Sequence, residues 1–180
     1  FAAFVARSNY KTDAERGDGC WGWNGKEWKS DAKFNWRNLG FAQTDDHPVV
    51  CVSWNDAQAY VKWLNDQHPS LPAGKKFRLL TEAEWEYSAR ASQGTQRFPW
   101  GDDLDYSVMC RWSNVADQTT KKEVPITASW AIDCNDNHAY TAPGGAFPAN
   151  AFGLHNLHGN AWEWVQDRWH DNYNGAPSDG

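Results

Sequence analysis

Hydrophobic residues recur at helical spacing in two segments of the chain, each preceded by a capping signal. In the first segment Ser53 and Asp56 are spaced as the two side chains of a capping box. The apolar positions that follow lie on one helical face: Ala57, Tyr60, Val61 and Leu64. This pattern predicts a helix over residues 54–66.

The second segment begins with Thr81 and Glu84, which form a full capping box. Trp85 and Ala89 then continue one apolar face until serine and glycine interrupt the pattern. We therefore predict a second helix over residues 82–91.

Shorter patterns fill the rest of the chain. The hydrophobic runs at residues 49–52 and 77–80 precede the two helices and are typical of brief strands. Residues 1–5 have the spacing of an amphipathic helix. Between residues 94 and 151, Gly, Pro, Asn and Asp occur too often for long elements, so this half is predicted to consist of loops.

Aromatic residues supply most of the hydrophobic surface. The 180 residues include 13 Trp, 8 Phe and 6 Tyr but a single Met. Large rings with polar edges favour an irregular core in which indole and phenol groups bond to the backbone. The length fits a single domain, residues 1–180.

Net charge and hydropathy argue against two classes of partner, nucleic acid and membrane. The net charge of -6 argues against nucleic acid, because binding a phosphate backbone requires clustered Lys and Arg. No apolar run approaches the roughly 20 residues of a membrane span. These features leave a peptide or protein partner open.

Four cysteines allow three two-disulfide pairings, and none has the spacing of a metal finger. Cys110 and Cys134 bracket one loop-rich segment, where a bridge would restrict the chain; buried free thiols are the alternative. A bridge would imply an oxidising, extracytoplasmic compartment, periplasmic or secreted.

A candidate site lies in the segment from Phe152 to Asp167. Asn156, Gly159 and Glu163 are spaced so that a tight loop can surround a hard cation with carbonyl oxygens and a carboxylate. Ordinary turn residues and a solvated helix start are the alternative interpretation of the same residues.

A series of motifs, in this order, resembles the formylglycine-generating enzyme (sulfatase-modifying factor) family across the whole chain. The motifs are His47–Ala57, Arg78–Tyr87, Phe98–Gly101, Asn114–Asp117, Thr141–Pro143 and Gly153–Trp164. The resemblance implies an irregular α+β domain related to C-type lectin folds, with low regular secondary structure, two main helices, short strands and bound calcium.

The resemblance also implies an oxidase. Catalytic members convert a sulfatase cysteine to formylglycine with dioxygen and with copper held by two cysteines of a C-terminal segment. None of the four cysteines here matches that pair, so copper is expected only if a further C-terminal segment carries it. We expect the chain to lack both that segment and the N-terminal start, and a second chain to be one way of completing the fold.

Calcium ligands follow from the resemblance residue by residue. The first set is the Asn114 side chain, the Val115 carbonyl, Asp136 and the His138 carbonyl. The second set is Asn156, the carbonyls of Gly159 and Ala161, and Glu163. The family's Asp-Gly-aromatic segment reads Asp136-Asn137-His138 here, and Asn137 must take a conformation that glycine adopts easily.

Trp162 corresponds to a residue that lines the family's peptide groove. The alternative is a core ring beside Trp164, and alternation along an extended segment would put the two rings on opposite sides. We expect one of these Trp side chains to be buried and the other to lie near a cleft.

Three functions remain open at this point. The first is an oxygen-dependent oxidase of sulfatase-like cysteines. The second is a noncatalytic, calcium-stabilised lectin-like domain for binding or display. The third is the accessory domain of an iron-dependent sulfoxide synthase, which would need a His-rich iron-binding domain elsewhere.

Overall fold

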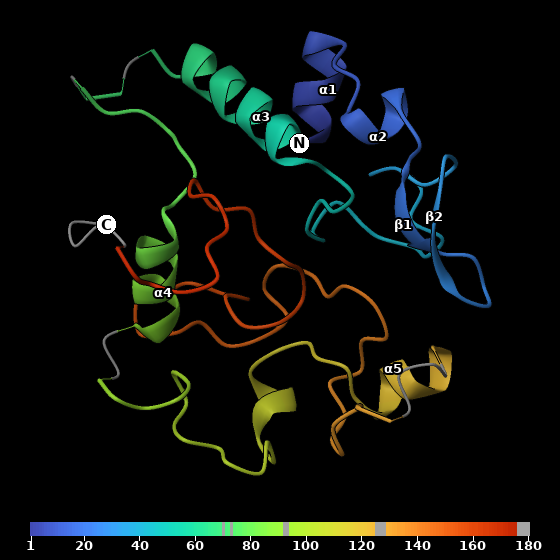
Figure 1. The fold of residues 1–180 in the computed structure, drawn as a ribbon, viewed down its shortest axis with the longest axis vertical. Helices are drawn as coiled ribbons and strands as arrows, with labels where there is room; N and C mark the ends of the chain where they lie inside the picture. Colours follow the sequence, from blue (N-terminus) through green and yellow to red (C-terminus); the bar gives the residue numbers. More distant parts are fainter. Residues whose placement is uncertain (70, 73, 92–93, 125–128, 176–180) are drawn as a thin grey trace.

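The computed structural model describes residues 1–180 except 70, 73, 92–93, 125–128 and 176–180. Its elements occur in the following order: α1 (Ala2–Ser8), α2 (Asp13–Arg16), β1 (Cys20–Trp23), β2 (Trp28–Asp31), α3 (Trp54–Gln67), α4 (Glu82–Arg90), the 3-10 turn η1 (Met109–Arg111) and α5 (Gln118–Glu123). Figure 1 shows the C-terminal stretch, orange to red, running through the middle of the molecule beside α4. The fold is α+β with little regular structure, as the sequence predicts.

The predicted helices are confirmed with their caps. The helix predicted at 54–66 is α3, and Ser53 and Asp56 form the capping box at its start. The helix predicted at 82–91 is α4, capped by Thr81 and Glu84. Arg78 donates two hydrogen bonds of 2.6 Å to the Glu84 carboxylate and lowers its pKa to about 2. The opening amphipathic pattern is α1.

Both predicted strands are wrong. Residues 49–52 and 77–80 form no ladder, because side chains and single backbone bonds satisfy their polar groups instead. Trp164 Nε1 donates to the carbonyl of Val52, and the side chain of Asn65 both accepts from and donates to the backbone of Phe77. Their hydrophobic side chains are not core residues, since Val49, Phe77 and Leu80 are exposed, and no strand among the described residues lies beside them.

The two observed strands form an antiparallel hairpin that the sequence pattern did not reveal. Cys20 pairs with Asp31, and Asn24 Oδ1 accepts two backbone hydrogen bonds in the turn. Gly22 is required in β1, since a Cβ there would lie 2.5 Å from the ring of Phe34. The lack of alternation in a Trp-Gly-Trp strand explains why periodicity failed to detect it.

Aromatic rings build the core, as the composition predicts. Phe4 is 3% exposed and lies against the rings of Phe1, Tyr10, Tyr60 and Trp63. The ring-to-ring distances are 4.9–5.8 Å, in tilted and edge-on geometries that aromatic pairs favour. This cluster fixes α1 to α3.

Residues 94–151 are mainly loops, with only η1 and α5 among the described residues. The Cys110–Cys134 disulfide is present, and Cys20 pairs with Cys51. No described helix has the length and apolar character needed to cross a membrane.

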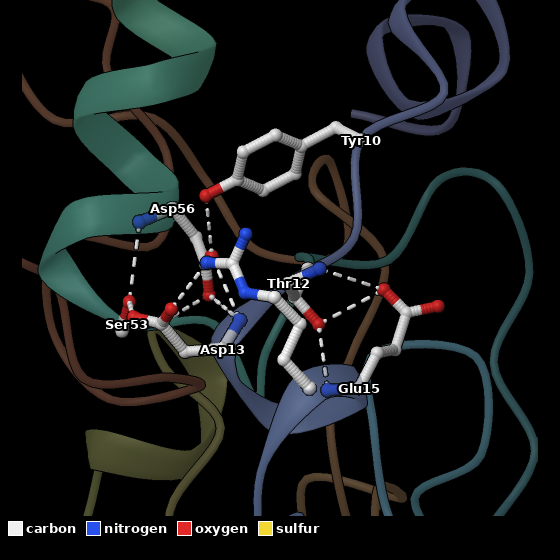
Figure 2. A network of polar contacts seen from close by, with 7 residues as sticks. Tyr10, Thr12, Asp13, Glu15, Ser53 and Asp56 are labelled. Carbon is white, nitrogen blue, oxygen red and sulfur yellow. Dashed lines mark hydrogen bonds and ion pairs between the residues drawn. The ribbon is translucent and has the colours of Figure 1, made fainter.

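One buried carboxylate joins the N-terminal elements (Figure 2). Asp56 has no exposed surface, and its oxygens accept hydrogen bonds from the Tyr10 hydroxyl at 2.9 Å and the Asp13 amide at 3.0 Å. It also accepts from the amide of Ser53, while Ser53 Oγ donates to Asp13. Asp56 thus caps α3 and pins α2 against the start of α3, directly after the groove-lining segment described below.

Replacing Asp56→Ala would leave three donors without a partner. We expect the free energy of unfolding to fall by about 3 kcal/mol or more, since each buried unsatisfied donor costs about 1–3 kcal/mol. Urea denaturation followed by circular dichroism measures this loss. Asp66→Ala is the matched control, because Asp66 lies on the same helix but pairs only with exposed Lys62. Equal stability losses for the two variants would contradict this role of Asp56.

Candidate functional site

The segment from Gly153 to Trp164 turns tightly because four of its residues have left-handed backbones. These are Gly153, Asn156, Gly159 and Asn160, with φ between 58° and 77°. Asn adopts this conformation more readily than most residues, and glycine has no Cβ to oppose it. The segment is therefore a chain of turns rather than a helix or a strand.

Asn160 holds this segment against two other loops, a role that sequence reasoning missed. Its backbone amide donates to the carbonyl of Asn114 at 2.8 Å, and its side chain exchanges two hydrogen bonds with the backbone of Ala142. Asn114 Nδ2 also donates to Asn160 Oδ1. The Gly-Asn pair at 159 and 160 is the sequence signal that could have identified this position.

The first predicted calcium set lies in a closed loop. The carboxylate of Asp136 accepts hydrogen bonds from the amides of Val115 at 2.8 Å and His138 at 2.7 Å. Asn114 Nδ2 donates to the carbonyl of Tyr140. All four predicted residues are thus brought together, and Asn137 between them has φ 69°, so it does adopt the conformation that the sequence required.

A second buried carboxylate, Asp117, lies behind this loop and was not predicted as a site residue. Asp117 Oδ2 accepts from the amide of Asp136 at 2.6 Å, and Oδ1 caps α5 through Thr120. Burial raises the pKa of Asp136, and the nearby charge of Asp117 adds to this effect. Cys110 lies close to both carboxylates, but its sulfur is in a disulfide and is no thiolate ligand.

The second predicted set includes an unpaired oxygen, that of the Asn156 side chain. Asn156 Oδ1 is buried without a hydrogen-bond partner, while its Nδ2 donates to the carbonyl of Gly144 at 3.0 Å. Glu163 accepts a 2.7 Å hydrogen bond from Trp85 Nε1 of α4. Surrounding protein desolvates the Glu163 carboxylate and raises its pKa. A cation at this position would satisfy the orphaned oxygen and compensate the carboxylate charge.

Both sets open onto one large groove. The groove has a volume of about 990 Å³, and its walls include members of the first set, Asn114 and Val115, and of the second, Asn156, Ala161 and Glu163. Asp136, His138 and Gly159 do not line it. Residues of both oxygen-rich loops therefore contribute to the groove wall.

Aromatic rings form another part of the groove wall. Trp162 is fully exposed and Trp164 is 54% exposed, and both line the groove. The expectation that one of them is buried is wrong, because the turns of this segment replace the strand alternation on which it depended. Trp21, Trp28, Trp130 and Tyr140 add further rings to the groove.

A polar cluster at the groove joins two segments that are distant in sequence. His47 Nδ1 and Thr141 Oγ1 lie 2.9 Å apart, and Gln43 Nε2 donates to Thr141 Oγ1 at 2.7 Å. His47 and Thr141 both line the groove, and neither was predicted as a site residue. Each begins one of the motifs described above, and this was the sequence feature that could have identified them as site residues.

These features define a class: an α+β domain with few regular elements, in which loops carry an aromatic groove and adjoining oxygen-rich sites. Residues 1–179 match the family model of the sulfatase-modifying factor enzyme 1-like domain, and the chain belongs to that family.

Relatives in this family include active and inactive proteins. The chain is 36% identical over 191 residues to the formylglycine-generating enzyme of Bos taurus, covering 94% of the chain and 46% of the relative. It is 35% identical over 208 residues to the formylglycine-generating enzyme of Thermomonospora curvata, covering 99% and 59%. It is also 34% identical over 131 residues to the inactive C-alpha-formylglycine-generating enzyme 2 of Bos taurus, covering 72% and 36%.

A solved structure supports the fold. PvdO from Pseudomonas aeruginosa superposes with a TM-score of 0.64 at 30% identity, covering 99% of this chain and 56% of that one. The chain thus spans about half the length of the curated formylglycine-generating enzymes described above.

Gly159 lies where the backbones of two loops of the site approach each other closely. With φ 73°, an added Cβ would lie 2.1 Å from the carbonyl oxygen of Asn114. We expect Gly159→Ala to lower the free energy of unfolding by about 3 kcal/mol, from left-handed strain and overpacking together.

Gly145→Ala is the control for this variant, since a Cβ there meets no atom within 4 Å. Its stability should stay within about 0.5 kcal/mol of the unmodified chain. Thermal denaturation of the two variants makes the comparison, and a Gly159→Ala protein as stable as the control would refute the close approach of the two loops.

Proposed function

We propose that the groove binds an extended, cysteine-containing peptide of the sulfatase type, and that the protein carrying this chain oxidises that cysteine. The observation that carries the proposal is the exposed Trp162 ring on the wall of a groove large enough for a peptide. Three further Trp side chains that line the same groove are also more than half exposed, and grouped exposed apolar surface of this kind is typical of a binding site: Trp21, Trp130 and Trp164. The names of the active relatives support the oxidative half of the proposal.

The chemistry of the groove suits a Cys-x-Pro-x-Arg sequence. Trp162 and Trp164 offer ring faces to the proline and to the peptide backbone. The exposed carboxylate of Asp46 lines the same groove and provides a partner for the arginine. Binding of this kind needs neither a regular sheet edge nor a helix from the peptide.

Copper does not fit the residues of this chain. Cys20, Cys51, Cys110 and Cys134 are all paired in disulfides, so none supplies the two thiolates that copper would require. The chain's own contribution to the reaction is to hold the peptide, orient it and shield it from water. The oxidative half of the proposal therefore holds only if the protein that carries this chain supplies a cysteine pair for copper elsewhere.

Calcium fits the second loop well. The oxygens of Asn156, Gly159, Ala161 and Glu163 would supply ligands from both side chains and backbone, and calcium takes about 6 to 8 oxygens. The unpaired Asn156 Oδ1 supports this proposal directly. In the first loop, the amide hydrogen bonds to Asp136 occupy part of its carboxylate, and free lone pairs remain for a cation shared with Asn114, Val115 and His138. The role of both ions would be structural.

A noncatalytic, calcium-stabilised binding domain is the second candidate. The inactive relative and the complete pairing of the cysteines favour it. The lectin-like display role and the sulfoxide-synthase accessory role share the same groove but have no described residue that favours them over peptide binding. Under either candidate we assign the protein to an extracytoplasmic compartment, because both disulfides need oxidising conditions to persist.

The peptide test uses a fluorescently labelled Cys-x-Pro-x-Arg peptide and anisotropy. We expect Trp162→Ala to weaken binding about tenfold or more, as truncation of a buried aromatic contact does. Trp169→Ala is the matched control, because Trp169 is 86% exposed and does not line the groove. Absence of binding by the unmodified protein would overturn the proposal.

Turnover is measured separately on the longest protein that carries this chain. The peptide is incubated with copper and dioxygen, and mass spectrometry detects conversion of the thiol to an aldehyde. Conversion supports the oxidase, whereas tight binding without conversion supports the noncatalytic domain.

Calcium should stabilise the chain. At a hundred times Kd for one site, the free energy of unfolding rises by about 2.7 kcal/mol. Calorimetric titration should give a stoichiometry of two ions for the unmodified protein and one for Glu163→Gln. Removal of calcium by a chelator should lower the melting temperature.

Glu27→Gln is the control for the calcium experiment, because Glu27 is exposed in the β1–β2 turn. It should keep both ions. Two ions bound by Glu163→Gln would rule out the second loop as a calcium site.

A further inference from the structure

The two disulfides lie in different surroundings. Cys51 lines the groove, and both it and Cys20 are partly exposed. Cys110 is 7% exposed in η1, and its sulfur lies 3.9 Å from Asp117 Oδ2. Thiol attack depends on access to one sulfur and on the stability of the thiolate that leaves, so the two bridges should respond differently to an external thiol.

The backbone of Cys51 also distinguishes its bridge. Cys51 has φ 62°, a left-handed conformation in which the Cβ of an L residue meets the following carbonyl. Neither Cys110 nor Cys134 has a positive φ. Cys51 is held in place by the disulfide itself and by the next two residues, because Val52 accepts from Trp164 Nε1 and Ser53 caps α3. Opening the disulfide would allow this conformation to relax.

The thiolates that leave on attack also favour exchange at Cys20–Cys51. Attack on Cys51 releases the thiolate of Cys20, which is partly exposed at the start of the hairpin. Attack on Cys134, which is partly exposed like Cys20 and Cys51, would release the thiolate of Cys110 into a buried position. Burial disfavours a thiolate.

We propose that Cys20–Cys51 is a thiol-exchange site on the groove wall, open to small thiols such as glutathione, and that Cys110–Cys134 is a structural bridge. The thiolate of the small molecule attacks Cys51 Sγ, the sulfur–sulfur bond breaks, and its electron pair leaves on Cys20 Sγ, which takes a proton from solvent. A second thiol then resolves the mixed disulfide, so that two thiols are oxidised to one disulfide and the protein disulfide is reduced to two thiols.

Exchange at this position would alter the groove. Trp21, next to Cys20, and Val52, next to Cys51, both line the groove. The disulfide is the covalent link between the hairpin and the segment that leads into α3. Its reduction would free one wall of the groove from the other, so the redox state of the bridge would control the width of the groove.

The experiment treats the unmodified protein with reduced glutathione, traps free thiols with iodoacetamide at increasing times, and maps the modified peptides. Trypsin places the four cysteines in four different peptides, so each is followed separately. We expect Cys20 and Cys51 to react at least about tenfold faster than Cys110 and Cys134, with glutathione found first on Cys51. Equal rates, or faster reaction of Cys110 and Cys134, would overturn the proposal.

A pair of Trp variants tests the link to the groove. Trp164→Phe removes the Nε1 donor to Val52, which should speed exchange at Cys20–Cys51 by about fivefold while leaving the other bridge unchanged. Trp169→Phe makes the same chemical change at an indole that donates only to Asp171, and it should leave both rates unchanged. A general increase at all four cysteines in Trp164→Phe would indicate global loosening and would contradict the local mechanism.

Discussion

The side-chain amide of Asn160 is the contact on which the site depends. The side chain of Asn160 accepts from the amide of Ala142, donates to its carbonyl, and accepts from the side chain of Asn114. The backbone amide of Asn160 donates to the Asn114 carbonyl. Three loops distant in sequence thereby share one set of hydrogen bonds, without a helix or strand to align them. A half-buried amide of this kind is useful because it offers donors and an acceptor within one rigid group.

Similar bonding replaces regular structure elsewhere. Asp56 performs the same task for α2 and α3, and Asp117 joins α5 to the loop of Asp136. A chain with few strands must satisfy its buried backbone groups through side chains, which explains why Asn and Asp occur at so many turns. The consequence is that side-chain hydrogen bonds take the place of backbone ladders in these loops.

Sequence alone revealed the parts of this structure that depend on local rules. Capping boxes at Ser53 and Thr81 identified α3 and α4, because the capping bonds lie within a few residues. The strands predicted at 49–52 and 77–80 failed because strand formation depends on a neighbour, and these segments bond to distant side chains instead. The resemblance to a family identified the oxygen-rich loops, whereas Asn160, Asp117 and the His47–Thr141 pair became evident only from contacts between distant residues.

The groove shows how a stiff site is built from such loops. Part of its wall belongs to turns with left-handed residues, including Asn156 and Asn160. Another part includes Cys51, which is also left-handed but is joined to Cys20 by a disulfide. Left-handed positions held by glycine or asparagine carry little strain, whereas one held by cysteine carries more. The turns built on Asn and Gly therefore keep their conformation without a covalent bond, whereas the backbone at Cys51 depends on its disulfide, so exchange of that bridge would act on this part of the groove.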